Sequence, residues 1–221
     1  MSDYYPIFVD LRGKAALVVG GGPVAEGKVR GLLEAGACVT VVSPDLTPEL
    51  QQLAQKGELL WVQRKYQTGD TAGSFLVIGA TNDPAANAAV WEEASARNQL
   101  ANIVDDIPHC NFIAPSILRQ GDLTVAISTG GRAPTLAVRL REKLEPLIGA
   151  EYARFLQMVA PLRAVLLQKH PPFAVRKKLW YQLVDSDILD LLKKGDEATA
   201  WQRIYTIFGI EPGELENPPQ A

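Results

Sequence analysis

Short apolar runs alternate with amphipathic stretches along the first hundred residues of the chain. Runs rich in Val, Leu and Ile predict buried strands at 15–19, 39–42, 59–62, 75–80 and 100–104. Between these strands, apolar residues at helical spacing predict helices at 24–35, 48–56 and 84–97. Strands that alternate with helices in this way indicate an α/β fold with a Rossmann-like, doubly wound and mainly parallel sheet.

Single residues support the ends of two of these helices. Gly36 follows the first helix, where glycine accepts the left-handed backbone that often ends a helix. Asp83 precedes the third helix and suits its N-cap, and Pro84 suits its first position.

The pattern changes near residue 111. Strands are predicted at 112–117 and 123–128, joined by a turn at 119–122, and a helix is predicted at 133–147. From residue 151 onward nearly every stretch has the pattern of a helix. We therefore expect three parts, which are a Rossmann domain at 1–111, a small α+β dimerisation segment at 112–150 and a helical domain at 151–221.

A glycine-rich loop lies between the first predicted strand and the first predicted helix. Residues 20–25 match the pattern G-x-G-x-x-A of dinucleotide-binding loops. Gly20 suits the tight turn, and Gly22 lets a pyrophosphate approach the backbone. Pro23 and Val24 begin the helix, whose N-terminus attracts anions. The alternative is a glycine turn that binds no dinucleotide.

The ends of two further strands predict how a dinucleotide would lie. Ser43, Pro44 and Asp45 follow the second strand, where an acidic residue binds the ribose 2′-hydroxyl of NAD. No arginine lies close by in the sequence to favour NADP, so we expect NAD. Ala80 and Thr81 follow the fourth strand and are expected beside the nicotinamide half.

Composition and charge narrow the class of protein. The 221 residues include 22 Lys and Arg against 25 Asp and Glu, so bulk charge gives no indication of nucleic-acid binding. The basic run at 176–178 lies beside aromatic residues but does not recur, and a solvated helix face is expected there. No apolar run is long enough to span a membrane. Two cysteines without paired spacing, and an N-terminus unlike a signal peptide, favour a reducing cytoplasm.

Four stretches of the sequence resemble the precorrin-2 dehydrogenase (siroheme synthase) family. They are YPIFVDLRGKAALVVGGGPVAEGKV, ATNDPAAN, NIVDDIPHCNFIAPS and LTVAISTGGRAPTLAVRLREKLE, in the order usual for that family. The resemblance covers residues 4 to about 150, and the last two stretches are not general features of Rossmann domains. The chain is too short to include the methyltransferase that some members carry, so it resembles the stand-alone form.

The resemblance implies an enzyme of sirohaem biosynthesis. The expected reaction is NAD-dependent dehydrogenation of the tetrapyrrole precorrin-2 to sirohydrochlorin. Some members also insert iron, so Fe²⁺ is a possible further substrate. The resemblance further implies a homodimer that interlocks through residues 112–150.

The family's key carboxylate maps to Asp105. A carboxylate there accepts a proton or orients the macrocycle, and as a hard oxygen ligand it also suits the passage of iron. The alternative is that Asp105 only caps a turn, and Asp106 is expected to be a solvated loop residue. His109 suits a proton shuttle, because imidazole titrates near neutral pH. The alternative is that His109 is an ordinary loop residue beside Cys110. With two histidines in the chain, no resident metal site is expected.

Three residues are predicted to contact the substrate. Ser128 begins a polar, glycine-containing loop before a helix, which suits contact with an anion. Arg132 supplies a cation for the carboxylates of the tetrapyrrole, although a solvated face or a dimer salt bridge explains it equally well. Asn102 precedes the key carboxylate on the fifth strand.

Three other functions remain open on the sequence. The first alternative is a chelatase that has lost dehydrogenation, and the second is a non-catalytic sensor of NAD or tetrapyrrole. The third is an unrelated small Rossmann dehydrogenase. The intact glycine loop argues against the first of these. The segments 102–105 and 128–131 argue against the last.

Overall fold

The computed structural model describes residues 4–169 and 172–214. The chain divides between Ala114 and Pro115 into two compact units. The predicted division into three parts, with boundaries near 111 and 150, stays a prediction.

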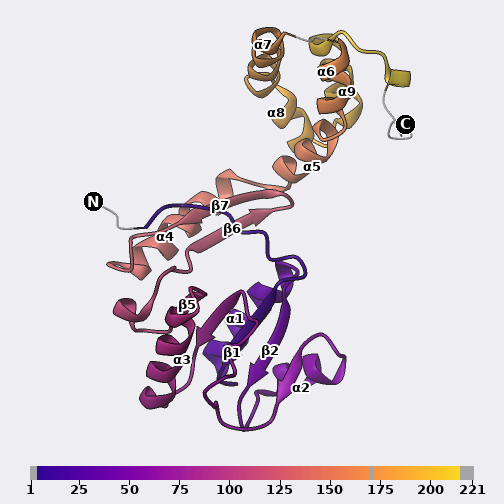
Figure 1. The fold of residues 1–221 in the computed structure, drawn as a ribbon. Helices are drawn as coiled ribbons and strands as arrows, with labels where there is room; N and C mark the ends of the chain where they lie inside the picture. The colour runs from indigo at the N-terminus through magenta and orange to yellow at the C-terminus, as the bar shows by residue number, and fades with distance from the viewer. Residues whose placement is uncertain (1–3, 170–171, 215–221) are drawn as a thin grey trace. The chain divides into compact units, whose positions relative to one another are not determined.

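The first unit contains the parallel sheet that the sequence predicts. Five strands pair in the order β3-β2-β1-β4-β5, all of them parallel (Figure 1). Their bounds are Ala15–Val19 for β1, Cys38–Val42 for β2, Leu60–Val62 for β3, Leu76–Gly79 for β4 and Leu100–Ile103 for β5. Val19 pairs with Val42 on one side and with Gly79 on the other, so the carboxyl ends of β1, β2 and β4 lie level.

Three helices accompany this sheet, with bounds close to those expected. They are α1 at Pro23–Glu34, α2 at Pro48–Gln55 and α3 at Pro84–Ala96. The Asp83 carboxylate accepts hydrogen bonds from the N–H groups of Ala85 and Ala86, at 3.0 and 3.3 Å, so it is the N-cap of α3 as predicted. Gly36, just beyond α1, has a φ of +76° and fills the left-handed position.

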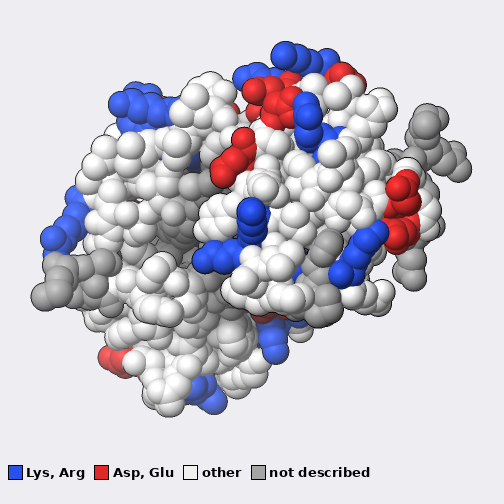
Figure 2. Space-filling model, turned by 90° about the horizontal axis from the view of Figure 1, so that it is seen from above, with Lys and Arg blue, Asp and Glu red and all other residues white. Residues whose placement is uncertain are grey.

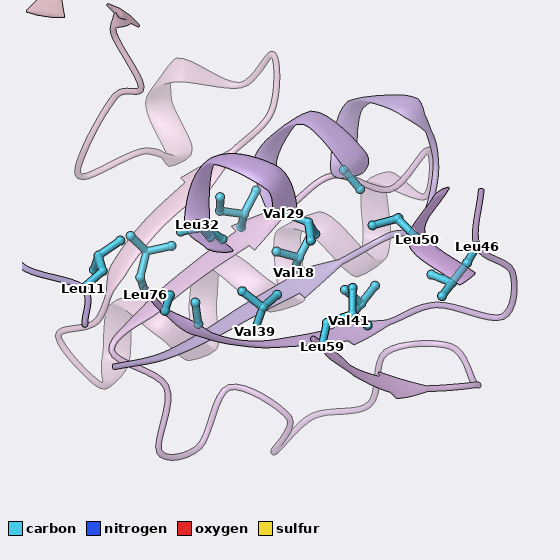
Figure 3. Close-up of a cluster of buried hydrophobic side chains, with 14 residues drawn as sticks. Leu11, Val18, Val29, Leu32, Val39, Val41, Leu46, Leu50, Leu59 and Leu76 are labelled. Carbon is cyan, nitrogen blue, oxygen red and sulfur yellow. The ribbon is translucent and has the colours of Figure 1, made fainter. Parts of the chain in front are cut away.

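The core of the first unit lies on both faces of the sheet. On one face, Val18, Val39 and Val41 pack with α1 and α2, as Figure 3 shows. On the other face, Val77 and its neighbours pack against Val90 of α3. Burial of each of these side chains contributes about 1.5–3 kcal/mol. This core fixes the strand ends from which the functional loops project.

The second unit begins with a β-hairpin that is displaced from its predicted position. The strands are β6 at Ser116–Gln120 and β7 at Leu123–Ile127. The strand predicted at 112–117 was therefore wrong over its first four residues. Pro115 has no N–H to give to a ladder, and the turn needs only two residues because Gly121 takes a φ of +57°.

Six α-helices are described in the second unit, and they are shorter than the sequence pattern predicts. Their bounds are Pro134–Leu144 for α4, Ala150–Val159 for α5, Leu162–Lys169 for α6, Phe173–Val184 for α7, Ile188–Lys193 for α8 and Glu197–Phe208 for α9. Pro146 ends α4 early in a 3₁₀ turn, and Pro161 separates α5 from α6. Met158, Leu166 and Phe208 are among the buried residues that hold α5–α9 together.

Charged side chains on the face shown in Figure 2 occur in small groups among wide uncharged areas, with both signs present. Over the described residues, no helix combines the length and the apolar character needed to cross a membrane.

Candidate functional site

A cavity of about 930 Å³ lies in the first unit, at the carboxyl ends of β1, β2 and β4. Its lining comes from β1, from the ends of β2 and β4, from the loop after β3 and from the start of α3. The lining residues are Val19, Gly20, Val42, Ser43, Pro44, Lys65, Tyr66, Gln67, Thr68, Thr81, Asn82, Asp83, Pro84, Ala86 and Ala89. The strand order reverses between β1 and β4, which is where open α/β sheets bind ligands.

Gly20 is required by the packing of the protein itself. Its φ is +118°, and a Cβ at this position would lie 2.7 Å from the carbonyl carbon of Ala80. Its N–H donates to the carbonyl oxygen of Val42 at 2.9 Å, while the N–H of Ala80 donates to that of Val19 at 2.8 Å. These bonds bring the loops after β1 and β4 into contact at the mouth of the cavity.

Gly21 has a role that the sequence pattern does not indicate. A Cβ there would lie 2.7 Å from Cδ2 of Leu46 and 2.9 Å from Oγ of Ser43. The carbonyl oxygen of Gly21 also accepts a hydrogen bond of 2.9 Å from the N–H of Thr47. The middle glycine therefore lets the loop after β2 pack directly on the glycine loop.

Gly22 differs from Gly20 and Gly21, because no contact among the described residues requires a glycine there. Its φ of −85° and ψ of −176° suit any residue, and a Cβ would meet no described protein atom within 4 Å. Gly22 is the N-cap of α1, and no side chain caps this helix end. An open space beside uncapped N–H groups fits the pyrophosphate of a dinucleotide.

The first turn of α1 presents Pro23 and Val24 to solvent, whereas Ala25 is fully buried beneath them. The small side chain of Ala25 lets the helix lie close to the sheet. Val24 is a large apolar residue that is 53% exposed, at the place where the sequence predicts contact with the cofactor.

The loop after β2 contributes Ser43 and Pro44 to the cavity. Ser43 is almost buried, and its carbonyl oxygen accepts a hydrogen bond of 2.9 Å from Nε1 of Trp61. Asp45 follows the last lining residue of this loop and is exposed to solvent. The carboxylate expected at the adenosine ribose thus lies beyond the wall of the cavity.

The loop after β4 places Thr81 in the cavity wall. Its carbonyl oxygen accepts a hydrogen bond of 3.0 Å from Nδ2 of Asn87, and its Oγ1 accepts one of 3.2 Å from the N–H of Asp83. Ala80 lies against Gly20 through its carbonyl group. Both predicted neighbours of the nicotinamide therefore belong to a fixed turn.

The loop after β3 brings Lys65 and Tyr66 into the cavity, and sequence reasoning considered neither residue. The predicted third strand could have indicated them, because the carboxyl end of β3 lies at the same edge of the sheet as the ends of β1 and β2. Among the described residues that line the cavity, Lys65 is the only lysine or arginine.

Asp105 occupies a strained position just beyond β5. Its φ is +61°, in the left-handed region, and its side chain is exposed. A residue with a Cβ pays a steric cost there, although aspartate tolerates it better than most. Strain of this kind concentrates at functional sites.

Asp106 and His109 form a pair next to Asp105. Oδ2 of Asp106 lies 2.7 Å from Nδ1 of His109, and both side chains are a little over 40% exposed. The ring of Trp91 lies against the imidazole, with 5.6 Å between the ring centroids. Asp106 is thus a partly exposed loop residue, as the sequence suggests, and its carboxylate also contacts His109.

Asn102 and Cys110 hold this loop over the end of β5. Nδ2 of Asn102 donates to the carbonyl oxygen of Phe112 at 3.0 Å and lies 3.4 Å from Sγ of Cys110. The thiol bonds the carbonyl oxygens of Ile103 and Asp106, and burial raises the pKa of Cys110. Asn102 is 8% exposed, and its predicted contact with substrate stays a prediction.

Ser128 and Arg132 lie in the second unit, on the loop between β7 and α4. Oγ of Ser128 accepts a hydrogen bond of 3.0 Å from the N–H of Gly130. Gly130 and Gly131 both have left-handed backbones, with φ of +62° and +76°, which turns the chain sharply before α4. Arg132 is exposed at this turn.

Clusters of metal-binding side chains are absent from the described part of the chain. Residues 4–169 and 172–214 contain no group of three or more His, Cys, Asp or Glu side chains arranged to hold a metal ion.

Two families match the chain over most of these loops. A family described as putative NAD(P)-binding matches residues 7–116, and one described as sirohaem biosynthesis protein central matches residues 120–146. The second match includes Ser128 and Arg132, and the first includes every predicted residue of the cavity and of the Asp105 loop.

Curated relatives agree with these matches. Siroheme synthase 1 of Aeromonas salmonicida (strain A449) is 42% identical over 212 residues, which are 96% of this chain and 45% of that protein. Siroheme synthase 1 of Serratia proteamaculans (strain 568) is 41% identical over 202 residues, which are 91% of this chain and 42% of that protein. The chain therefore spans about half the length of these relatives.

A solved structure matches the chain over nearly its whole length. It is that of SirC, a precorrin-2 dehydrogenase, with a TM-score of 0.76 and 28% sequence identity. The match covers 92% of this chain and 100% of that one.

Proposed function

The chain belongs to the precorrin-2 dehydrogenase and sirohaem synthase family, and on this premise we propose that it oxidises precorrin-2 to sirohydrochlorin with NAD. The observation that carries the proposal is Gly22, a glycine without a packing reason at the uncapped start of α1. A phosphate-bearing cofactor supplies that reason, because its pyrophosphate needs the space that a Cβ would fill.

The cofactor lies across the carboxyl edge of the sheet in this proposal. Gly20 and Gly22, with Pro23 and Val24, receive the pyrophosphate, and Ser43, Pro44 and Asp45 lie toward the adenosine ribose. Ala80 and Thr81 lie toward the nicotinamide, which accepts the hydride when NAD is bound. The fixed turn that holds Thr81 gives this end of the site a defined shape.

The dehydrogenation removes a hydride and a proton from the macrocycle, so the protein must provide a proton acceptor. We assign that role to the Asp105 carboxylate, which is exposed and held by a strained backbone. His109 passes the proton on from its Nε2 atom, because Asp106 occupies its Nδ1 atom. Solvent then receives the proton.

The carboxylates of the tetrapyrrole need polar and cationic partners. We assign this binding to Ser128 and Arg132, with Asn102 supporting the loop that carries Asp105. The left-handed backbones of Gly130 and Gly131 turn the chain between Ser128 and Arg132, so both side chains belong to one short loop.

The oligomeric state and the compartment belong to the same proposal. A homodimer formed through residues 112–150 would cover apolar side chains of α4, since Leu136 is 53% exposed and Leu140 is 40% exposed. We place the protein in the cytoplasm and propose no membrane or nucleic-acid partner.

Anaerobic absorbance of the purified protein with precorrin-2 and NAD tests the activity. We expect NADH to appear together with the spectrum of sirohydrochlorin, and Asp105→Asn to abolish both. An absence of NADH with competent substrate would overturn the dehydrogenase and favour a sensor that binds without turnover.

A second stage adds ferrous iron to the completed reaction. Conversion to sirohaem that is faster than in a control without protein would make Fe²⁺ a further substrate, served by the same exposed carboxylate. An equal rate in both samples would limit the protein to dehydrogenation.

A further inference from the structure

One wall of the cofactor cavity is a loop without regular secondary structure. Residues 63–75 connect β3 to β4 through bends and turns, and Lys65, Tyr66, Gln67 and Thr68 face the cavity. Such a loop keeps a defined shape only where other groups fix it, because its backbone pairs with neighbouring strands only at Phe75 among the described contacts.

The first restraint on this loop is internal. The guanidinium of Arg64 binds the carboxylate of Asp70 through two hydrogen bonds of 2.7 Å each. Oδ2 of Asp70 also accepts a hydrogen bond of 2.9 Å from the N–H of Gln67. These bonds close the segment 64–70 on itself, but they do not attach it to the rest of the unit.

The second restraint comes from Glu93 on α3. Its carboxylate accepts a short hydrogen bond from the hydroxyl of Tyr66 and bonds of 3.0 Å from the N–H of Gly69 to both oxygens. Arg97, one turn further along the same helix, donates from Nη2 at 3.1 Å. The loop and the helix are thus joined at the two loop positions 66 and 69.

The position of Glu93 is unusual for a carboxylate on a helix. Its side chain is only 9% exposed, whereas Glu92, its neighbour in the sequence, is exposed. A buried carboxylate is costly unless donors surround it, and two of the three donors here belong to the cavity loop. The contacts made by Glu93 therefore stabilise the position of the loop more than they stabilise the helix.

We infer that Glu93 is a positioning residue for the dinucleotide, acting through Tyr66 and the backbone N–H of Gly69. It holds residues 65–68 at the distance from Ser43 and Thr81 that the cofactor requires. The inference rests on the proposed function, because it names the ligand of that cavity as NAD. Glu93 itself does not line the cavity, and it takes no part in proton or hydride transfer.

Binding and steady-state kinetics of three variants test this role. Glu93→Gln keeps the size of the side chain but replaces one acceptor oxygen with an NH₂ group that faces the donors of the loop. Tyr66→Phe removes a single hydrogen bond, and Glu92→Gln is the matched control on the exposed face. We expect the NADH dissociation constant to rise about tenfold in Glu93→Gln, two- to fivefold in Tyr66→Phe and not at all in Glu92→Gln.

The same variants separate positioning from a general loss of stability. In Glu93→Gln and Tyr66→Phe the KM for NAD should rise by a larger factor than kcat falls, because the released loop lines the cofactor cavity. Glu92→Gln should match the wild type in both constants. Amide hydrogen exchange at Gly69 should become faster in Glu93→Gln. Should Glu93→Gln fail to fold, Tyr66→Phe decides, since it keeps the bond from Gly69.

Two results would overturn the inference alone. The first is a Glu93→Gln variant whose amide hydrogen exchange at Gly69 is faster but whose NADH dissociation constant is unchanged. The second is a variant in which kcat falls by the same factor as the KM values for NAD and for precorrin-2 rise. Wild-type protein that binds no NADH would overturn the proposed function as well. A wild type that binds NADH and oxidises precorrin-2 would leave that proposal standing whatever the variants show.

Discussion

Nδ1 of His109 lies 2.7 Å from Oδ2 of Asp106. This contact fixes the orientation of the imidazole, and the ring of Trp91 supports it from one side. A carboxylate on one ring nitrogen settles which nitrogen is left to exchange protons, which is Nε2 here. The pair therefore gives His109 a defined orientation in the loop that carries the strained Asp105.

A double-mutant cycle measures this pairing. His109→Ala should lower kcat about tenfold, and Asp106→Asn should lower it by a smaller factor, because the ring loses its orientation but keeps its base. The double variant should be no slower than His109→Ala. Independent, multiplying effects on kcat would show that Asp106 does not act through His109.

Asp105 offers a test in which stability and activity move in opposite directions. Asp105→Gly should raise the free energy of unfolding by about 0.5–1 kcal/mol, because glycine accepts a φ of +61° without strain. The same change should lower kcat about a hundredfold or more through loss of the carboxylate. Urea titration and anaerobic turnover check the two effects, and a destabilised Asp105→Gly would contradict the strain.

Gly20 and Gly22 form a matched pair for the glycine loop. Gly20→Ala should destabilise the protein by about 2 kcal/mol or more, since its Cβ has no space beside Ala80. Gly22→Ala should cost no more than about 1 kcal/mol, the difference between glycine and alanine at an N-cap, and weaken NADH binding about tenfold. Thermal unfolding and NADH titration distinguish the two, and normal NADH binding by folded Gly22→Ala would count against a pyrophosphate at Gly22.

Acid should release the loop that Glu93 and Asp70 hold. Burial alone raises the pKa of Glu93, but hydrogen bonds from Tyr66, Gly69 and Arg97 outweigh it and leave the pKa lowered. Arg64 likewise lowers the pKa of Asp70. A lowered pKa in the folded state contributes stability above the ordinary value of 4.5 for Glu93, and that contribution disappears as the pH falls through the folded pKa.

Urea unfolding from about pH 7 to about pH 3 checks this contribution. The difference in stability between wild type and Glu93→Gln should be largest near neutral pH and should shrink as the pH falls below the ordinary value. Glu92→Gln should follow the wild type throughout. A difference that stays constant with pH would mean that the charge of Glu93 does not stabilise the fold.

Lys65 should influence the choice between NAD and NADP. It lies in the cavity wall with Ser43 and Pro44, whereas Asp45 is exposed beyond them. Lys65→Glu should therefore raise the ratio of kcat/KM for NAD over NADP about tenfold, by repelling a 2′-phosphate. Lys56→Glu makes the same charge change outside the lining and should leave the ratio unaltered. An unaltered ratio in Lys65→Glu would place the ribose elsewhere.

The fold of the first unit follows from local pattern, but part of its site does not. Runs such as 15–19 and 76–79 are apolar throughout because both faces of the sheet are covered, and this is visible in the sequence. The glycine loop is visible too, because its spacing follows the pattern G-x-G-x-x-A between a strand and a helix. Glu93 is not visible, because its partners Tyr66 and Gly69 are 27 and 24 residues away and share no periodic pattern with it.

The errors in the second unit have a different cause. Apolar character alone suggested a strand from residue 112 and a nearly unbroken helical pattern from residue 151 onward. Proline and the short turn at Gly121 set the actual limits. Hydrogen-bonding capacity overrides hydrophobicity at these positions, and it has to be weighed residue by residue.

The contact of Gly21 with Leu46 and Thr47 has a consequence for protein engineering. The segment 43–47 is the natural place to redesign for a different cofactor, and it shares its packing with the middle glycine of the phosphate loop. A library that varies all five positions would disturb the loop that holds every dinucleotide. Substitutions confined to Pro44 and Asp45, whose side chains are exposed, leave that support intact.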